Sequence, residues 1–214
     1  MRLTVADLAA ERGGETIFSG VSFTLGAGNA LVITGPNGAG KSTLLRTLAG
    51  LLPATAGSIE FDGGSETWPT LAAALHYLGP QNAMKPALTV GENLEFWRVF
   101  NGSPRLSVAQ ALESVRLPDV GHLPYGYLST GQRRRISIAR LLVSHRPVWL
   151  LDEPTSGLDM ASERRFAELM KDHLAEAGIV VAATHLPLGL GSTHSLVLDG
   201  RGTVTPAAVT ETQA

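Results

Sequence analysis

Residues 35–43 read Gly35-Pro36-Asn37-Gly38-Ala39-Gly40-Lys41-Ser42-Thr43 and match the pattern GxxxxGK(S/T) at every fixed position. The apolar run 30–34 before them predicts a buried strand, and the leucines after them recur at helical spacing, at Leu44, Leu45, Leu48, Leu51 and Leu52. The glycines let backbone N–H groups converge on phosphate oxygens, and the helix dipole adds positive potential. The stretch therefore predicts a phosphate-binding loop between a strand and a helix, with all nine residues as candidates for nucleotide contact.

Two side chains of this loop suit a nucleotide that is bound together with Mg²⁺. We expect the Lys41 ammonium to reach the β- and γ-phosphates and the Ser42 hydroxyl to be a ligand of Mg²⁺. The alternative, a glycine-rich turn that binds nothing, needs neither the lysine nor the hydroxyl, nor a strand and a helix on its two sides. ATP and Mg²⁺ are the expected cofactors.

The composition bounds the class of protein. With 214 residues the chain is long enough for one large domain, or one domain with an inserted lobe. A formal net charge of −2 provides no general basic field, so we expect no nucleic acid as a partner. The absence of cysteine excludes disulfides and thiolate metal sites. No apolar run approaches the roughly 18 to 20 residues of a membrane span, so a role at a membrane would need another chain to cross it.

The order of apolar runs predicts an α/β fold. Residues 3–25 alternate short apolar runs with turn residues and predict several short antiparallel strands. Farther on, the runs 148–153 and 179–183 read as buried strands, with a helix over 159–177 between them. Strands that alternate with helices indicate a sheet whose carboxyl edge holds the phosphates. Residues 195–204 predict a closing hairpin, and residues 206–214 a frayed tail.

Between residues 81 and 132 the pattern becomes helical. Thr89 and Glu92 have the spacing of a capping box, and Ser107 and Gln110 repeat it. We expect a single domain with a core at 1–80 and 133–205, an inserted helical subdomain at 81–132 and a tail at 206–214. The aromatic side chains in this subdomain are expected in its core; the alternative is that some line a groove for a partner helix, and they are Phe96, Trp97 and Phe100.

Asp152 and Glu153 follow the apolar run 148–151 directly. At the end of a buried strand the two carboxylates can lie beside the phosphate loop. We expect Asp152 to hold Mg²⁺ through water and Glu153 to polarise the water that attacks the γ-phosphate. A helix cap or an acidic turn is the alternative for this pair.

The stretch 128–132 reads Leu-Ser-Thr-Gly-Gln and precedes three arginines, Arg133, Arg134 and Arg135. Three cations in a first helical turn oppose the helix dipole, and a nearby anion would relieve the cost. A solvated basic face, or pairing with local acids, explains them equally well, and the sequence does not separate these possibilities.

The order of these motifs resembles the nucleotide-binding subunit of the ATP-binding cassette (ABC) transporters. The phosphate loop, Leu-Ser-Thr-Gly-Gln at 128–132, the strand ending in Asp152-Glu153, Ser-Gly-Leu-Asp at 156–159 and Ala-Thr-His at 183–185 cover nearly the whole chain. Thr130 departs from the glycine that is common there. The resemblance implies a RecA-like core, an N-terminal antiparallel β-subdomain, an inserted helical subdomain, and ATP hydrolysis by a homodimer.

The same resemblance implies roles for further residues. Two subunits would sandwich two ATP molecules, with Ser129, Gly131 and Gln132 of one subunit facing the γ-phosphate that Lys41 of the other holds. Asp159 would link the two sites across the interface. His185 would contact the γ-phosphate and sense its loss, a role that suits a histidine at the end of a buried strand.

Two positions of the family pattern are irregular. The glutamine that contacts Mg²⁺ and reports the γ-phosphate to the membrane partner falls on Pro80 by spacing, so Gln81, one residue later, is the candidate. An aromatic residue that stacks on adenine belongs near residue 12, where the chain has Arg12. A guanidinium can stack on a base, so Arg12 replaces the aromatic or the binding is weaker and less selective.

A narrower resemblance is to the ATPases of the haem exporters of cytochrome c maturation, carried most specifically by residues 85–90 and 126–129. It implies integral membrane partners of the haem-exporter permease type and a peripheral position on the cytoplasmic face of a bacterial inner membrane. We expect no direct haem binding. The alternatives are the same ATPase exporting another substrate, a soluble cassette ATPase that acts as a mechanical or regulatory module, and a small-molecule P-loop kinase, in which residues 128–132 would have no role.

Overall fold

A computed structural model describes residues 1–199 and, as backbone, 204–211. The chain divides into two compact units. The first unit consists of residues 1–79, 147–154 and those from Met170 onward, and the second consists of 80–146 and 155–169. The second unit thus takes in more of the chain than the expected helical subdomain at 81–132, whose boundaries stay a prediction.

The first unit begins with an antiparallel sheet of strand order β2-β1-β4. Strand β1 (Arg2–Arg12) and strand β2 (Glu15–Gly26) form a hairpin, and β4 (Ala56–Asp62) pairs with the other edge of β1. Gly13 and Gly14 make the turn with φ angles of 62° and 83°, a conformation that only glycine adopts freely. Several short strands were expected here, but the structure has two long ones. The pairing of β1 with β2 continues past the polar residues because the register shifts at irregular positions, such as that between Val5 and Leu8.

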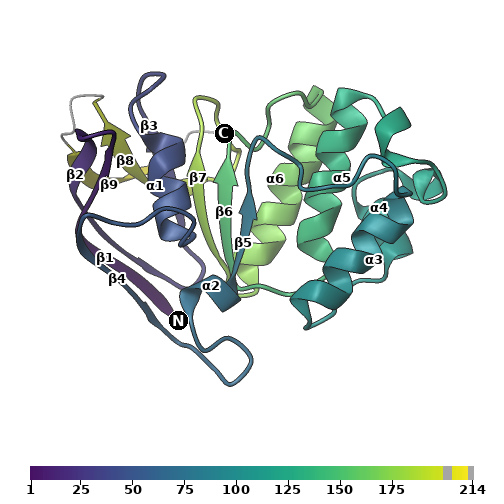
Figure 1. Cartoon of the computed structure of the whole chain (residues 1–214), viewed down its shortest axis with the longest axis horizontal. Helices are drawn as coiled ribbons and strands as arrows, with labels where there is room; N and C mark the ends of the chain where they lie inside the picture. Colours follow the sequence, from purple (N-terminus) through teal and green to yellow (C-terminus); the bar gives the residue numbers. More distant parts are fainter. Residues whose placement is uncertain (200–203, 212–214) are drawn as a thin grey trace. The chain divides into compact units, whose positions relative to one another are not determined.

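The second sheet of this unit has the strand order β5-β6-β7-β3-β8-β9 (Figure 1). Its parallel members are β5 (Leu75–Leu78), β6 (Val148–Asp152), β7 (Ile179–Ala183), β3 (Ala30–Thr34) and β8 (Ser192–Leu198). Every residue of β6 and β7 is buried, as in sheets covered on both faces. The expected α/β fold with an N-terminal antiparallel sheet is confirmed.

The last strand corrects the expectation of a tail. Strand β9 (Val204–Glu211) pairs antiparallel with β8 along its whole length, so residues 206–211 are part of the sheet. The open edge of β8 offers a row of backbone donors and acceptors, and pairing with β9 satisfies them. The expected turn at 200–203 and the end of the tail at 212–214 lie outside the described residues.

Helix α1 (Lys41–Leu48) packs against β1 of one sheet and against β6 and β7 of the other, so it lies between them (Figure 1). Its buried leucines join one hydrophobic core with side chains of both sheets, among them Leu3, Phe18, Leu150 and Val181. The helix ends sooner than the leucine spacing predicted, and Leu51 is exposed. A four-residue helix, α2 (Leu71–Ala74), leads into β5.

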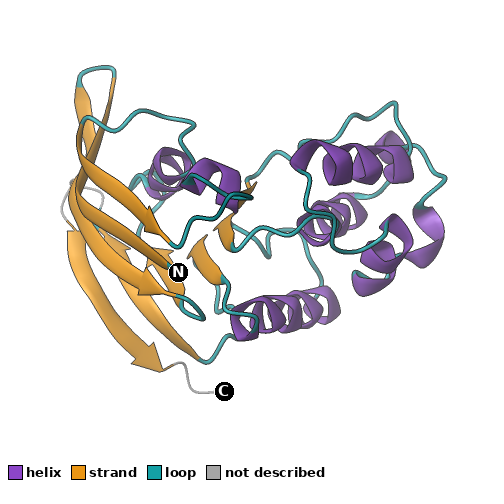
Figure 2. Cartoon of the chain, turned by 90° about the horizontal axis from the view of Figure 1, so that it is seen from below, coloured by secondary structure: helices purple, strands orange, loops and turns teal. Residues whose placement is uncertain are grey.

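The named elements of the second unit are all helical, as the purple ribbons of Figure 2 show. They are α3 (Val90–Asn101), α4 (Val108–Ser114), the 3-10 turns η1 (Pro118–Val120) and η2 (Tyr125–Tyr127), α5 (Thr130–Leu142) and the first ten residues of α6 (Met160–Ala175). The capping boxes expected at Thr89 and Ser107 are present. In the described part of the chain, no helix is both long enough and apolar enough to span a membrane.

The expectation that the aromatics of α3 are core residues is wrong for two of them. Phe96 is 48% exposed and Phe100 is 70% exposed. Val90 and Leu94 carry the buried face of the helix, which turns the row of Phe96, Val99 and Phe100 to the surface. Trp97 is half-buried, and its indole N–H donates to the Ala83 carbonyl at 2.9 Å.

Candidate nucleotide-binding site

The phosphate loop joins the end of β3 to the start of α1, as the sequence predicted. Gly40 has a φ of 96°, and a Cβ built on it would lie 2.7 Å from Cγ2 of Ile17, so a side chain does not fit there. No side chain caps the N-terminus of α1. Its first backbone N–H groups therefore remain available for an anion, with the positive end of the helix dipole behind them.

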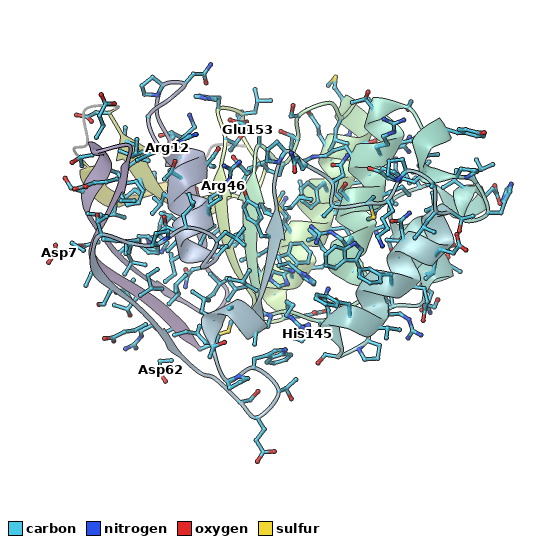
Figure 3. All side chains as sticks on the ribbon, viewed as in Figure 1. Asp7, Arg12, Arg46, Asp62, His145 and Glu153 are labelled. Atoms are coloured by element: carbon cyan, nitrogen blue, oxygen red, sulfur yellow. The ribbon has the colours of Figure 1, made fainter. Side chains whose placement is uncertain are left out.

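A cleft of about 360 Å³ opens beside this loop. Apart from loop and α1 residues 37–43, its lining comes from three other places in the first unit: Arg12 at the end of β1, Ile17 in β2 and Glu153 after β6. Figure 3 labels Arg12 and Glu153 at these positions. A cleft of this size, with backbone N–H groups on one wall and the cations Arg12 and Lys41 in its lining, suits a small polyanionic ligand.

Lys41 is buried within the loop, with its side chain directed at the loop's own carbonyls. Its ammonium donates to the carbonyls of Gly35 at 2.7 Å and Pro36 at 3.0 Å, and lies 3.0 Å from Nε2 of His185. His185 lies two residues beyond β7. Oδ1 of Asn37 is 3.2 Å from the same Nε2, and because the ammonium is a donor and this amide oxygen an acceptor, the tautomer of the imidazole determines which of the two it hydrogen-bonds.

Ser42 and Asp152 meet at the carboxyl end of β6. The Ser42 hydroxyl donates to Oδ1 of Asp152 at 3.0 Å, and Asp152 is only 3% exposed. A hydroxyl and a carboxylate side by side are oxygen ligands of the kind that Mg²⁺ uses, with waters and substrate phosphates supplying the rest. Among the described residues there is no cluster of three or more His, Cys, Asp or Glu that could hold a metal, so the pair fits Mg²⁺ bound jointly with phosphate better than a metal held by protein alone.

Glu153 has a strained backbone. Its φ of 44° lies in the left-handed region, and its N–H donates to the Ala183 carbonyl at 2.8 Å, which holds the turn after β6 against the end of β7. Oε1 of its side chain is 3.7 Å from Nε2 of His185, and the carboxylate is 40% exposed. The strained turn thus directs this carboxylate into the cleft, toward the space above the phosphate loop.

Sequence reasoning gave Tyr77 no place in the site. The Tyr77 hydroxyl donates to Oδ2 of Asp152 at 3.3 Å, so both oxygens of this carboxylate accept from hydroxyls. The contact arises because β5 pairs with β6, with Tyr77 opposite Leu150. The signal in the sequence is only a tyrosine near the end of a predicted strand, and it becomes informative once the strand order is known.

The other candidates lie in the second unit. Ser129 and Gln132 form a capping box at the start of α5: the Gln132 N–H donates to Ser129 Oγ at 3.2 Å and the Ser129 N–H to Gln132 Oε1 at 2.9 Å. A Cβ on Gly131 would lie 3.2 Å from the Gly157 carbonyl. Asp159 caps α6 by accepting from the Ser162 N–H at 2.7 Å, and this hydrogen bond lowers the pKa of Asp159. Gln81 is exposed.

The three arginines after Gln132 do not form the solvated face that was one explanation for them. Arg134 is buried, 6% exposed. Arg133 donates to the Gly126 carbonyl and has its guanidinium 5.8 Å from the centre of the Tyr125 ring, while Arg135 donates to the Arg116 carbonyl at 3.3 Å. Backbone carbonyls and an aromatic face therefore offset part of the cost of placing these cations at the start of a helix.

The geometry of the first unit is that of a site for a nucleoside triphosphate, and the comparisons agree. The sequence model of the family described as "ABC transporter" matches residues 18–156. The "Cytochrome c biogenesis ATP-binding export protein CcmA" of Chelativorans sp. is 65% identical over 92% of this chain and 97% of that protein. The protein of the same name from Brucella melitensis is 61% identical over 94% of this chain and 93% of that protein.

Solved structures add the fold. The ATP-binding subunit of an ABC transporter superposes with a TM-score of 0.83 and 24% identity, over 98% of this chain and 90% of that one. A bacterial Atm1-family ABC exporter with ATP bound gives a TM-score of 0.78 and 30% identity over 94% of this chain and 37% of that longer one. The chain belongs to the ABC transporter family of ATP-binding proteins and, within it, to the group of these CcmA proteins.

Proposed function

We propose that this chain is the ATP-hydrolysing subunit of a membrane transporter in c-type cytochrome biogenesis, with haem as the transported group. The observation that carries the proposal is the convergence of Lys41, Ser42, Asp152, Glu153 and His185 at the carboxyl edge of a parallel sheet. Lys41, Ser42 and Glu153 also line the cleft beside the phosphate loop. The near full-length similarity to proteins named for cytochrome c biogenesis and export supports the biological setting.

The reaction is in-line attack of water on the γ-phosphate of ATP. Lys41 binds the β- and γ-phosphates together with the backbone N–H groups of the loop, and Glu153 accepts a hydrogen bond from the attacking water and orients it. His185 donates to the γ-phosphate and is the group that registers its departure. Ser42, Asp152 and Gln81 would hold Mg²⁺, which supplies charge neutralisation at the phosphates when it is bound.

The remaining candidates complete the site in a homodimer. Arg12 stacks on the adenine at the open side of the cleft, where it lies in the lining. Ser129, Gly131 and Gln132 of the partner subunit face the γ-phosphate, which is favourable because they start α5 and its dipole attracts an anion. Asp159 connects the two sites across the interface. A single chain therefore carries both halves of a site but hydrolyses ATP only as a dimer.

The membrane partner docks on the second unit. Phe96, Val99 and Phe100 form an exposed apolar row on α3, hereafter the α3 face, and Glu92 and Glu95 border the hollow beside it. An apolar row of this kind on a surface helix is a place for another helix, here a cytoplasmic segment of the permease. The subunit would accordingly be peripheral, on the cytoplasmic face of the inner membrane, and would not bind haem itself.

The decisive test uses cells in which Glu153→Gln replaces the wild-type protein. We expect the purified variant to bind ATP with unchanged affinity and to hydrolyse it at least about a hundredfold more slowly, because the amide cannot accept the proton of the attacking water. In the cells, covalently bound haem in c-type cytochromes should be lost. Glu113→Gln, the same change at an exposed position of α4, is the control and should leave both measurements unchanged.

The outcomes separate the parts of the proposal. Loss of haem attachment that the wild-type gene restores would connect ATP turnover by this chain to cytochrome c maturation. Normal haem attachment with hydrolysis abolished would refute the transport assignment and leave the ATPase, so that another exported substrate would have to be found. Full recovery of the protein in the soluble fraction would instead favour a cassette ATPase without a membrane partner.

A further inference from the structure

Asp152 is held from two sides by hydroxyl groups. Oδ1 accepts from Ser42 at 3.0 Å and Oδ2 accepts from Tyr77 at 3.3 Å, and the carboxylate is almost fully buried. Ser42 belongs to the phosphate loop and is itself a proposed ligand. Tyr77 comes from strand β5, and its hydroxyl donates to the carboxylate oxygen of Asp152 that Ser42 does not contact.

Tyr77 is itself held in place by a cation. The guanidinium of Arg46, labelled on α1 in Figure 3, hydrogen-bonds to the Tyr77 hydroxyl, and this bond raises the pKa of Arg46. The donors run in one direction, from the Arg46 N–H to the Tyr77 oxygen and from the Tyr77 O–H to Asp152. Hydrogen bonds arranged in such a chain polarise and strengthen one another.

The backbone that follows β5 leaves room for this ring. A Cβ on Gly79 would lie 2.8 Å from Cε1 of Tyr77 and 3.0 Å from its hydroxyl oxygen. Tyr77 thus lies against the backbone of Gly79, and any side chain there would displace the ring from Asp152. Gly79 directly precedes Pro80 and Gln81 in the sequence, so the ring packs on the segment that leads to the candidate glutamine.

We propose that Tyr77 is a positioning residue for the metal-binding carboxylate: it fixes the orientation of Asp152 and so determines how well Mg²⁺ binds together with ATP. This inference rests on the proposed function, because it assigns Mg²⁺ to Ser42 and Asp152. The role follows from geometry. A carboxylate bound by one hydroxyl can rotate about its Cβ–Cγ bond, whereas one bound at both oxygens presents its lone pairs in a fixed direction.

Tyr77→Phe is the test, because it removes the hydroxyl and keeps the ring against Gly79. Partners of metal-binding side chains change metal affinity by about 10- to 100-fold when they are removed. We expect the Mg²⁺ concentration that gives half-maximal ATP hydrolysis to rise about tenfold, the low end of this range, because the Ser42 bond to Asp152 remains. The maximal rate at saturating Mg²⁺ should fall much less, and the affinity for ATP measured in EDTA should not change.

A second readout does not depend on hydrolysis. Mn²⁺ added to the protein with ATP is followed by electron paramagnetic resonance, and the fraction of bound Mn²⁺ gives the metal affinity of the ATP complex directly. We expect Tyr77→Phe to weaken Mn²⁺ binding by the same factor, and Arg46→Met to weaken it by less. Tyr127→Phe, which removes a hydroxyl from a ring that is 84% exposed, is the matched control and should behave as wild type.

Equal Mg²⁺ and Mn²⁺ dependence in Tyr77→Phe and wild type would overturn the inference and leave the proposed function intact. A parallel loss of ATP affinity in EDTA and of melting temperature would also overturn it, since that result describes a tyrosine that only supports the fold. If the wild-type protein itself fails to hydrolyse ATP at any Mg²⁺ concentration, the proposed function fails.

Discussion

Arg12 is the residue at which this site departs most clearly from the family pattern. It is the last residue of β1, where it pairs with Glu15 at the hairpin turn, and it lines the cleft beside the phosphate loop. The guanidinium is planar and can lie on a base, but it is a charged group that also interacts with water, which an aromatic ring is not. A weak, stacking contribution to adenine binding is therefore the expected role at an exposed position.

Replacing Arg12 by alanine should weaken ATP binding only slightly. A cation–π or stacking contact at an exposed site contributes about 0.5–1 kcal/mol, which corresponds to a two- to fivefold higher dissociation constant. Arg12→Tyr should bind ATP at least as tightly as wild type, because it restores an aromatic face. Titration with a fluorescent ATP analogue measures both, and Arg2→Ala, at the opposite end of the same strand, is the control. An unchanged affinity in Arg12→Ala would show that the base is not held there.

The exposure of Phe96 and Phe100 shows that the packing of a helix, and not its sequence alone, determines which of its apolar residues are buried. Helix α3 has apolar residues on both faces, and the sequence alone does not tell which face meets the other helices. The tertiary structure buries Val90 and Leu94, and Phe96 stacks on Phe100 with ring centres 5.6 Å apart. An apolar row that a folded chain leaves in water is costly unless a partner covers it.

The double variant Phe96→Ser/Phe100→Ser should separate docking from hydrolysis. We expect the ATPase activity of the purified subunit to be unchanged, since these residues lie outside the cleft, and the stability to change by less than about 1 kcal/mol because surface substitutions have small effects. The amount of protein that sediments with membranes from cells containing the permease should fall severalfold. Leu51→Ser, at an exposed leucine of the first unit, is the control. Undiminished membrane association would mean that the partner docks elsewhere.

At the scale of the whole molecule, the candidate residues are divided between the two compact units. The first unit holds Lys41, Ser42, Asp152, Glu153 and His185, and the second holds Gln81, Ser129, Gly131, Gln132 and Asp159. In a head-to-tail dimer each site would combine the first-unit residues of one subunit with the second-unit residues of the other. ATP would then contact both subunits and stabilise the dimer. Such a dimer should persist for as long as the γ-phosphate remains.

Glu153→Gln should therefore dimerise in ATP and remain a monomer in ADP. Size-exclusion chromatography with light scattering measures the mass directly. Adding Ser129→Arg to this variant should abolish the dimer, because a long cation at the start of α5 would occupy the place of the γ-phosphate. Since this change also removes a helix cap, worth about 1 kcal/mol, its melting temperature has to be checked first. A dimer that forms equally well in ADP would contradict the ATP-dependent assembly.

The sequence predicted most of the fold because its signals are local. The buried strands 148–152 and 179–183 are apolar throughout, and the capping boxes at Thr89 and Ser107 lie within four residues each. The hairpin expected over 195–204 is present as the antiparallel pair of β8 and β9, but the length of β9 was underestimated, because its later residues belong to the sheet through pairing with the edge of β8 and not through a pattern of their own. Helix α1 ends at Leu48, and Gly50, two residues later, has a φ of 70°, a conformation in which a helix does not continue.

By itself the sequence determined the phosphate loop, because everything the loop needs is contained in nine consecutive residues: glycines for the bend, a lysine, and a hydroxyl at the start of a helix. Only the tertiary structure decided what surrounds Asp152. Its partners Ser42 and Tyr77 are 110 and 75 positions away along the chain, and they meet it because α1 packs on the sheet and β5 pairs with β6. Strand order and helix packing are set by the burial of the whole core, which no short stretch of sequence encodes.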